Sequence, residues 1–381
     1  MTACEVLIAG GGPAGSSCAW ALRNAGLDVV VLDKAAFPRD KVCAGWITPQ
    51  VIADLRLDPD DYRQGRTFEP ITAFRVGFIG AGDAVDVSYD RPVSFGVRRR
   101  EFDDYLLRRS EARLLLETPV RSIRRSGGRW VVNETITARM IVGAGGHFCP
   151  VARMLNGAAD RGPLVTAQEV EFHLGAIDAT AYTPAPGRPE LYFCRDRRGY
   201  GWCVRKGDHL NIGFGRLDAR ALPRATAGFI DFLKAQRIIP AEAAWRWRGH
   251  AYLVAASSGR RVVDEAAALV GDAAGLADPR SGEGIRPAIE SGLMAAAAIL
   301  EADGGYARER LVPYARQLRV RFGASAITPR LSEAIPAWVA GAAAGCLLRI
   351  PWFVRHVVLD RGFLHAAEPA LVTPDQKNRV M

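Results

Sequence analysis

The sequence has few of the features that mark secreted, zinc-binding or disulfide-stabilised proteins. Its 7 cysteines form no C-x-x-C pair, and their odd number and irregular spacing argue against a disulfide framework or a metal site. A reducing cytosol is therefore the expected compartment. The chain reaches a predicted core strand within its first few residues, which leaves no room for a signal peptide.

Long apolar runs are also scarce. The longest uncharged apolar stretch, residues 337–348, is too short to span a bilayer. The surrounding tract 337–358 suits the wall of a lipophilic tunnel, contact with a membrane surface, or a pair of core helices. We therefore expect a cytoplasmic protein, and peripheral membrane contact through the C-terminal helices stays open.

An excess of positive charge is present but modest. The 50 Lys and Arg residues against 41 Asp and Glu residues give a net charge of +9. The arginine runs are short and scattered, which favours a solvated basic surface over nucleic-acid binding. Such a surface would help contact with anionic lipid or a phosphorylated substrate. With 381 residues, 49% of them hydrophobic, the chain can fold as one large or two moderate domains.

The most informative segment is at the N-terminus. Residues 6–9 form an apolar run typical of a buried strand, residues 13–24 predict a helix, and the apolar run 29–32 predicts a second strand. This strand–helix–strand order is the setting in which a glycine-rich turn binds the phosphates of a dinucleotide.

The turn itself carries that pattern. Gly10, Gly12 and Gly15 fit G-x-G-x-x-G, and Asp33 ends the second strand. Gly10 permits a tight turn, Gly12 lets a pyrophosphate approach the backbone, and Gly15 lets the helix pack closely on the strand. The helix N-terminus offers N–H groups to the phosphates, and Asp33 can accept hydrogen bonds from a ribose. The sequence therefore predicts a cofactor that contains ADP.

The rest of the chain predicts more strands around a helical periphery. A helix is predicted within 97–115, an alanine-rich helix at 285–301, a short helix at 227–236, and mostly helices over 306–381. Predicted strands are at 118–123, 130–132, 136–142, 191–193, 202–204, 210–214 and 268–270, with further strands within 72–95.

These elements predict an α/β protein with two domains. A Rossmann-type domain with a parallel sheet is expected from residues 1–70, 96–164 and 256–320. An antiparallel-sheet domain that holds the substrate is expected from 71–95 and 165–255, and a helical C-terminal region from 321–381.

Three motifs in order carry a resemblance to a known class. After the N-terminal fingerprint come Arg99-x-x-Phe102-Asp103 and GDAAGLADPRSGEG at 271–284. Together they resemble the FAD-dependent oxidoreductases of the p-hydroxybenzoate hydroxylase-like class, over nearly the whole chain. The resemblance implies that Asp272 hydrogen-bonds the ribityl chain of FAD. It also implies that the loop 279–284 brings N–H groups and a helix N-terminus to the pyrimidine edge of the flavin.

Within that class, the details look most like the geranylgeranyl reductase family. The loop FPRDKVCAGWITP at 37–49 resembles the family's P-R-x-K-x-C-G-G-x-x-x-P segment, and Gly275 completes its form of the Gly-Asp motif. The strand pair that begins Tyr200-Gly201-Trp202 resembles its substrate-lining Y-x-W-x-F-P-K-G. In three places the chain departs from the pattern: Ala44 replaces a glycine, Val204-Arg205 replaces Phe-Pro, and 145–149 lacks the aspartate of D-G-x-x-S.

The resemblance implies a large cofactor site and a smaller reactive one. Cys43, near the flavin, would donate a proton or simply pack a turn, and Tyr200 and Trp202 would flank the substrate or belong to the sheet core. Trp46 is placed similarly. His147 and His250 are more often structural than catalytic when no paired carboxylate is visible. The implied cofactor-binding residues are Gly10, Gly12, Pro13, Ala14, Gly15, Asp33, Lys34, Lys41, Cys43, Ala44, Arg99, Val120, Gly145, Gly271, Asp272, Pro279, Gly282, Gly284 and Ile285.

Three reactions are compatible with these motifs. The first is reduction of carbon–carbon double bonds in a lipophilic, prenyl-like substrate by reduced FAD. The second is hydroxylation of an aromatic or polyketide molecule by an FAD-dependent monooxygenase, and the third is halogenation. FAD bound as a purely structural element is a fourth reading. No second glycine fingerprint follows a strand, so the electrons would come from transiently bound NAD(P)H or from a protein carrier.

Overall fold

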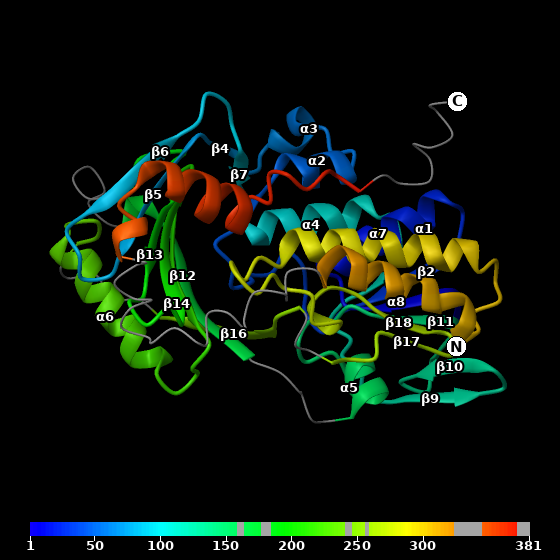
Figure 1. Ribbon diagram of the computed structural model, residues 1–381. Coiled ribbons are helices and arrows are strands. Elements are labelled where there is room, and N and C mark those ends of the chain that lie inside the picture. The colour runs from blue at the N-terminus through cyan, green and yellow to red at the C-terminus, as the bar shows by residue number, and fades with distance from the viewer. Residues whose placement is uncertain (158–163, 177–183, 241–245, 256–258, 324–344, 372–381) are drawn as a thin grey trace.

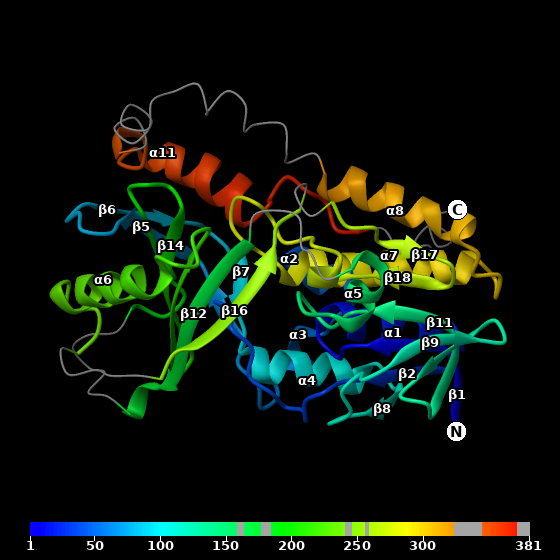
Figure 2. The same ribbon diagram turned by 90° about the horizontal axis from the view of Figure 1, so that it is seen from below.

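The protein is described by a computed structural model that covers residues 1–157, 164–176, 184–240, 246–255, 259–323 and 345–371. Two large sheets lie at opposite ends of the molecule, and a three-stranded sheet lies between them (Figures 1 and 2). The expected α/β class, with a parallel and an antiparallel sheet, is confirmed.

The first large sheet has a parallel centre. Its strand order is β17-β18-β11-β1-β2-β8, and the five strands from β18 to β8 run parallel. The apolar run Val6, Leu7 and Ile8 in β1 is fully buried, since neighbours cover both faces of the strand. The strands are β1 (Thr2–Ala9), β2 (Val29–Leu32), β8 (Arg113–Leu115), β9 (Ile123–Ser126), β10 (Arg129–Val132), β11 (Ile136–Gly143), β17 (Val263–Asp264) and β18 (Ala267–Leu269).

Helices α1, α4 and α7 lie side by side next to this sheet (Figure 1). α1 and α7 approach very closely, because a Cβ at Gly292 of α7 would lie 2.3 Å from the Ala14 carbonyl oxygen of α1. The close approach holds the start of α1 against the middle of α7. The helices of this part are α1 (Pro13–Asn24), α4 (Arg99–Arg109), α5 (Pro150–Asn156), α7 (Ile285–Glu301) and α8 (Arg308–Phe322), with a single turn η2 (Gly271–Ala273).

The second large sheet has the order β16-β12-β15-β14-β13-β5-β6, and every pair except β13–β5 is antiparallel. Its side chains alternate between two apolar clusters: Cys203 packs with α6, and Trp202 and Val204 pack with the C-terminal helix. The elements are β5 (Ala73–Phe78), β6 (Ala84–Ser88), β12 (Leu164–His173), η1 (Leu174–Ala176), β13 (Glu190–Phe193), β14 (Gly199–Lys206), β15 (His209–Arg216), β16 (Arg248–Leu253), α6 (Leu222–Ala235), α11 (Pro351–Phe353) and the π-helix η4 (Val354–Phe363).

The small sheet connects the two large ones. Its order is β3-β7-β4, and it places Trp46 of β3 against Phe74 of the second large sheet. Two short helices follow β3 in the chain. The elements are β3 (Trp46–Ile47), β4 (Glu69–Ile71), β7 (Ser94–Gly96), α2 (Pro49–Asp54) and α3 (Pro59–Arg63).

Several sequence-based predictions need correction. The helix predicted within 97–115 ends at Arg109, where Glu111 takes a left-handed backbone conformation with φ 51°. The strand beside β2 at the edge of the sheet is therefore β8. The strand predicted at 118–123 does not form, and β9 begins at Ile123. In the C-terminal region, 364–371 is not helical, and 324–344 and 372–381 lie outside the described residues. The division into domains stays a prediction.

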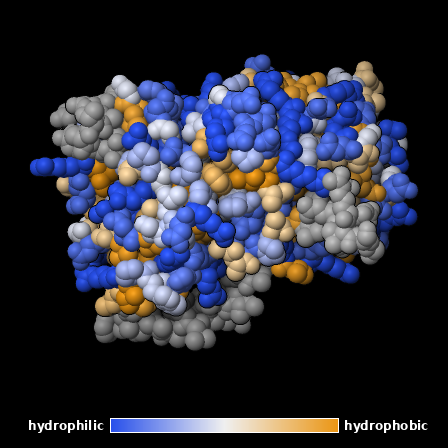
Figure 3. All heavy atoms as spheres, turned by 90° about the horizontal axis from the view of Figure 1, so that it is seen from above, coloured by the Kyte–Doolittle hydropathy of each residue, from blue (hydrophilic) through white to orange (hydrophobic). Residues whose placement is uncertain are grey.

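The surface shows no extended apolar face on the side drawn in Figure 3, where hydrophobic residues form separate patches between hydrophilic ones. Within the described ranges, each helix is too short or too polar to cross a bilayer.

Candidate active site

A cavity of about 380 Å³ lies between the part of the molecule with the parallel sheet and the part with the antiparallel sheet. It is lined by the start of α1, the end of β2, the loop 39–46, the end of β11, strands β14 and β16, the loop before α7, and Phe363 of η4. A cavity of this volume is in the range that holds a small molecule or cofactor. Its polar and apolar walls come from different parts of the chain.

The glycine-rich turn forms one end of this cavity. Gly10 has φ 123°, and a Cβ at Gly15 would lie 1.9 Å from the Gly10 carbonyl oxygen, so both positions require glycine. No side chain caps α1 at Gly12 and its first turn has no acidic residue, so its N–H groups are available to an anion. Asp33 accepts hydrogen bonds from the N–H groups of Gly11 (2.7 Å) and Ala35 (2.9 Å), and thereby fixes the turn.

Asp272, at the start of η2, faces the side chains of His250 and Lys41. Its Oδ2 lies 3.6 Å from His250 Nε2, and His250 Nε2 lies 2.5 Å from Lys41 Nζ. Burial alone would raise the pKa of Asp272, but the hydrogen bond with His250 and the charge of Lys41 lower it below its usual value. Burial lowers the pKa of Lys41 to about 8. Asp272 is therefore an ionised acceptor at neutral pH.

The loop that carries Cys43 is held from behind by a polar network. The Cys43 N–H donates to Glu169 Oε2 at 2.5 Å, and Asn211 Nδ2 donates to the Cys43 carbonyl oxygen at 3.4 Å. On the cavity side, Arg99 and Cys43 both line the cavity, close enough for their charges to interact. Arg99 is itself fixed by two hydrogen bonds to Asp103, of 2.7 and 2.8 Å. The thiol thus sits beside a permanent positive charge.

The same network contains two carboxyl groups whose pKa values are shifted in opposite directions. The buried Lys206 ammonium lies 2.5 Å from Glu171 Oε2. Although burial opposes ionisation, Lys206 and Arg98 lower the pKa of Glu171 to about 2. Burial instead raises the pKa of Glu169 to about 7. One carboxyl group is therefore always charged, and its neighbour titrates near neutrality.

The far end of the cavity is aromatic. Trp46, Tyr200, Trp202 and Phe363 line it, and the rings of Tyr200 and Phe363 meet edge to face at 5.4 Å between centroids. The Tyr200 hydroxyl donates to the Ser281 carbonyl oxygen at 2.5 Å, and Trp202 Nε1–H donates to Asn211 Oδ1 at 2.7 Å. Burial raises the pKa of Tyr200 well above its usual value, so it stays a phenol.

The structure brings most of the predicted site residues to one cavity. Gly10, Gly15 and Gly271 lie behind the wall and shape it, Pro279 lines a smaller cavity, and Val120 packs against the core of the first sheet without reaching the cavity. The predicted residues that line it are Gly12, Pro13, Ala14, Asp33, Lys34, Lys41, Cys43, Ala44, Arg99, Gly145, Asp272, Gly282, Gly284, Ile285, Tyr200 and Trp202.

Sequence reasoning missed several lining residues. His250, weighed as structural, lies in the cavity with Tyr252, two residues further along β16, as strand alternation would indicate. Glu283 lies inside a motif that was recognised for its glycines. Phe363 comes from a segment whose position depends on long-range packing and carries no local signal.

Comparison with known proteins identifies the family. Residues 5–76 match the family described as FAD dependent oxidoreductase. A menaquinone reductase of Mycobacterium tuberculosis is 31% identical over 321 residues, which cover 77% of this chain and 75% of that protein. A geranylgeranyl diphosphate reductase of Rhodobacter capsulatus is 31% identical over 321 residues, which cover 78% of this chain and 75% of that protein. The chain belongs to the geranylgeranyl reductase family of FAD-dependent oxidoreductases.

The fold agrees with this family. A geranylgeranyl bacteriochlorophyll reductase-like protein from Thermoplasma acidophilum has a solved structure that matches with a TM-score of 0.76, at 17% sequence identity. The match covers 96% of this chain and 98% of that one, and at this identity it shows the fold alone. The family and the FAD-dependent activity expected from the sequence are confirmed.

The cavity fits the cofactor of a geranylgeranyl reductase-like flavoprotein. The uncapped start of α1 suits a diphosphate, and a Cβ at Gly12 would reach within 3.3 Å of the Arg39 guanidinium that borders the same space. The ionised Asp272 can accept hydrogen bonds from a polyol. These donor and acceptor groups are of the kinds that FAD requires.

Proposed function

We propose that this FAD-dependent oxidoreductase reduces a carbon–carbon double bond in a lipophilic, prenyl-like substrate. The carrying observation is a single cavity with phosphate- and polyol-binding groups at one end, an aromatic wall at the other, and Cys43 in its lining. The names of the relatives, a geranylgeranyl diphosphate reductase among them, support a prenyl substrate. When bound and reduced, FAD supplies a hydride.

The polar end of the cavity is proposed to hold the cofactor. The N–H groups at the start of α1 would bind the diphosphate, Asp33 the adenosine ribose, and Asp272 the ribityl chain. Lys41 and His250 keep Asp272 ionised and so preserve its capacity as an acceptor. Gly282 and Gly284 would place backbone against the flat ring system. The protein itself also excludes a side chain at Gly282, because a Cβ there would lie 2.2 Å from the Tyr252 hydroxyl.

The aromatic end is proposed to hold the substrate. Tyr200 and Trp202 have their polar atoms bonded to protein, so their rings present apolar surface to the cavity. An isolated alkene accepts hydride poorly, so a proton donor is required. Cys43 is the proposed donor, since its thiol lines the cavity and its loop is held in place by Glu169 and Asn211.

Anaerobic reoxidation tests this function. The bound flavin is reduced without oxygen, and geranylgeranyl diphosphate or another prenyl compound is added while the flavin absorbance is followed. We expect reoxidation by the alkene and a product with one more saturated bond by mass spectrometry. Reoxidation only on addition of oxygen, with an oxygenated product, would instead support the monooxygenase hypothesis.

The reductant is proposed to be either NAD(P)H that binds transiently at the flavin or a protein electron carrier. Anaerobic mixing with NADH and NADPH distinguishes them: bleaching of the flavin absorbance supports the nicotinamide, and its absence with both supports a carrier.

We also propose peripheral contact with an anionic membrane surface near the C-terminal helices. Leu347, Ile350 and Trp352 are 37%, 46% and 65% exposed, and Arg349 lies among them. Trp352→Ala together with Ile350→Ser should reduce co-sedimentation with vesicles of anionic lipid, and unchanged sedimentation would exclude this contact.

A further inference from the structure

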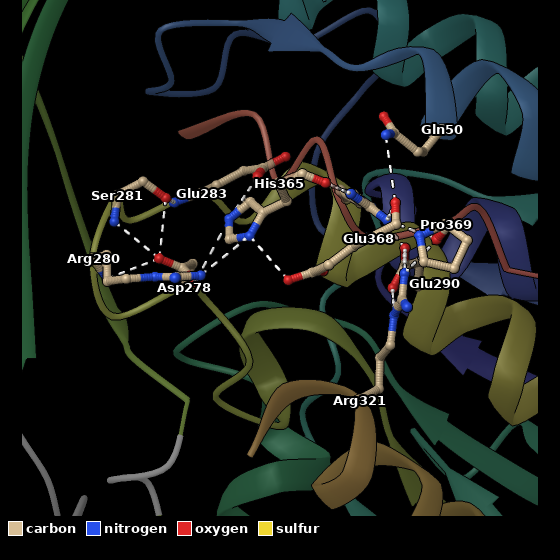
Figure 4. Close-up of polar contacts among 11 residues, drawn as sticks. Gln50, Asp278, Arg280, Ser281, Glu283, Glu290, Arg321, His365, Glu368 and Pro369 are labelled. Atoms are coloured by element: carbon tan, nitrogen blue, oxygen red, sulfur yellow. Dashed lines mark hydrogen bonds and ion pairs between the residues drawn. The ribbon is translucent and has the colours of Figure 1, made fainter. Parts of the chain in front are cut away.

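A second, smaller cavity adjoins the first. It has a volume of about 30 Å³, enough for one or two water molecules, and is lined by Glu283, His365 and Glu368 among others. Glu283 also lines the large cavity, so it lies between the two. Figure 4 shows His365 between the side chains of Glu283 and Glu368.

Glu283 is a buried carboxyl group that lacks hydrogen-bond donors among the described residues. Its side chain is 9% exposed, and among the described residues neither of its oxygens accepts a hydrogen bond. The nearest cation is His365, whose Nε2 lies 3.6 Å from Glu283 Oε2. Burial of a carboxylate without hydrogen-bond donors destabilises the folded state. A contribution to stability therefore does not explain the presence of Glu283 at this position.

His365 connects Glu283 to the surface. Its Nδ1 lies 3.2 Å from Glu368 Oε1, and Glu368 is 45% exposed. Two further charged groups face the ring from the loop before α7: Asp278 Oδ2 is 3.6 Å from Nε2, and an Arg280 nitrogen is 3.2 Å from Nδ1. From α7, Arg286 donates to the His365 carbonyl oxygen at 3.4 Å.

The segment that carries His365 and Glu368 is anchored firmly. Arg286 donates to the carbonyl oxygens of Glu368 (3.1 Å) and Pro369 (3.0 Å), and Arg321 donates to that of Pro369 at 2.9 Å. Both arginines also bind the buried Glu290, so these charges are paired with one another, and Arg286 and Glu290 act on Glu283 through their charges, which lower and raise its pKa.

We propose that Glu368, His365 and Glu283 form a proton path from solvent to the large cavity. The inference rests on the proposed alkene reduction, which consumes one proton in each turnover. That reduction transfers a hydride from reduced FAD to one alkene carbon and a proton to the other; the π bond breaks and two C–H bonds form. The path replaces the proton that the donor in the cavity has given up.

Each transfer has a donor and an acceptor at stated atoms. The Glu283 carboxylic acid releases its proton into the large cavity, and its carboxylate takes another from His365 Nε2–H, directly or through a water in the small cavity. The neutral imidazole, which keeps its Nδ1–H toward Glu368 Oε1, regains a proton at Nε2 from a water of the small cavity, and solvent beside Glu368 resupplies that water. No oxidant or reductant is involved in these steps.

The electrostatics agree with this geometry. Burial raises the pKa of Glu283 to about 7. Burial would lower the pKa of His365, but Glu368, Glu283 and Asp278 outweigh it and raise that pKa. Glu283 can therefore hold a proton near neutral pH, and the His365 ring is protonated more readily than a free imidazole, as a relay requires.

Two variants test the path in the FAD-loaded enzyme. Glu283→Gln and His365→Asn should bind FAD normally but slow steady-state prenyl reduction by about 100-fold. KM should be unchanged, and the wild-type pH dependence of kcat near neutrality should be lost. Glu134→Gln, in the turn between β10 and β11, is the matched control and should behave as wild type. A wild-type kcat in both variants would overturn the path.

A second measurement needs neither FAD nor substrate. In the apoprotein, the His365 ring is titrated by NMR, with His365→Asn to assign its signals. Removal of the Glu283 charge by Glu283→Gln should lower the pKa of His365 by about one unit. An unchanged titration would overturn the coupling on which the path depends. If no prenyl compound is reduced by the wild type, the proposed function fails while this titration still decides whether the two groups are coupled.

Discussion

Glu169 and Glu171 on β12 provide a sharp test of how the Cys43 loop is supported. Both belong to one buried network, yet burial raises the pKa of Glu169 to about 7, whereas Lys206 and Arg98 overcome burial and lower that of Glu171 to about 2. Replacement of each by glutamine keeps the shape and removes the titration. The two variants should therefore respond to pH in different ways.

The sign and size of the pH effect on stability follow from the linkage between proton binding and folding. A carboxyl group whose folded-state pKa rises from 4.5 to about 7 leaves stability unaffected below 4.5 and lowers it as pH rises to 7. Over this range the loss is about 3 kcal/mol. Glu169→Gln removes this titration. Between pH 5 and 8 its free energy of unfolding relative to that of the wild type should therefore rise by about 2–3 kcal/mol.

Glu171→Gln is the control. The Glu171 carboxylate is ionised at both pH values, so this variant should be destabilised by a constant amount, about 3–5 kcal/mol, because Lys206 is left buried without its partner. Urea denaturation of the apoprotein at pH 5 and pH 8, followed by tryptophan fluorescence, measures both differences. A pH-independent difference for Glu169→Gln, or an equal pH response of both variants, would refute the reasoning.

Three further predictions concern the cofactor and the reaction. Asp272→Ala should purify with little or no FAD; wild-type flavin absorbance would refute its role. Gly15→Ala should lose FAD and about 1–3 kcal/mol of stability, since its Cβ would meet the Gly10 carbonyl oxygen at 1.9 Å. Gly12→Ala should keep its stability and bind FAD more weakly, so equal thermal midpoints for the two glycine variants would contradict the packing argument. Cys43→Ala should retain FAD and slow prenyl reduction; unchanged turnover would leave Cys43 a packing residue.

The half with the parallel sheet was largely predictable because its signals are local. The helix predicted at 13–24 and the strand predicted at 29–32 have the same bounds in the structure as α1 and β2. Each depends on an apolar run or a glycine spacing that operates within one strand–helix–strand unit. The prediction at 118–123 failed where the local pattern was weak: the chain turns at 116–117, where Glu117 has φ 52°, and of these residues only Ile123 belongs to a strand, β9.

The aromatic end of the cavity and the Cys43 loop were less predictable because they are assembled from distant segments. Cys43 meets Glu169 across 126 positions, and Tyr200 meets Ser281 across 81. No periodicity in the sequence encodes these distances; they follow from how the two sheets and the Cys43 loop pack together. Resemblance to a family predicted Cys43, Tyr200 and Trp202, but it did not indicate Glu169, Phe363 or His365.

Two buried carboxyl groups near the cavity, Glu169 and Glu283, both have a pKa raised to about 7 by burial, yet their contacts give them different roles. Glu169 Oε2 already accepts from the Cys43 N–H and from Asn211, so the Glu169 side chain serves to hold a loop. Glu283 has no hydrogen-bond donor among the described residues, and it adjoins both the reaction cavity and a histidine near solvent. A raised pKa alone would not separate the two. The bonded carboxyl group is fixed in place, and only the unbonded one is free to pass a proton on, which is why the proton path is assigned to Glu283.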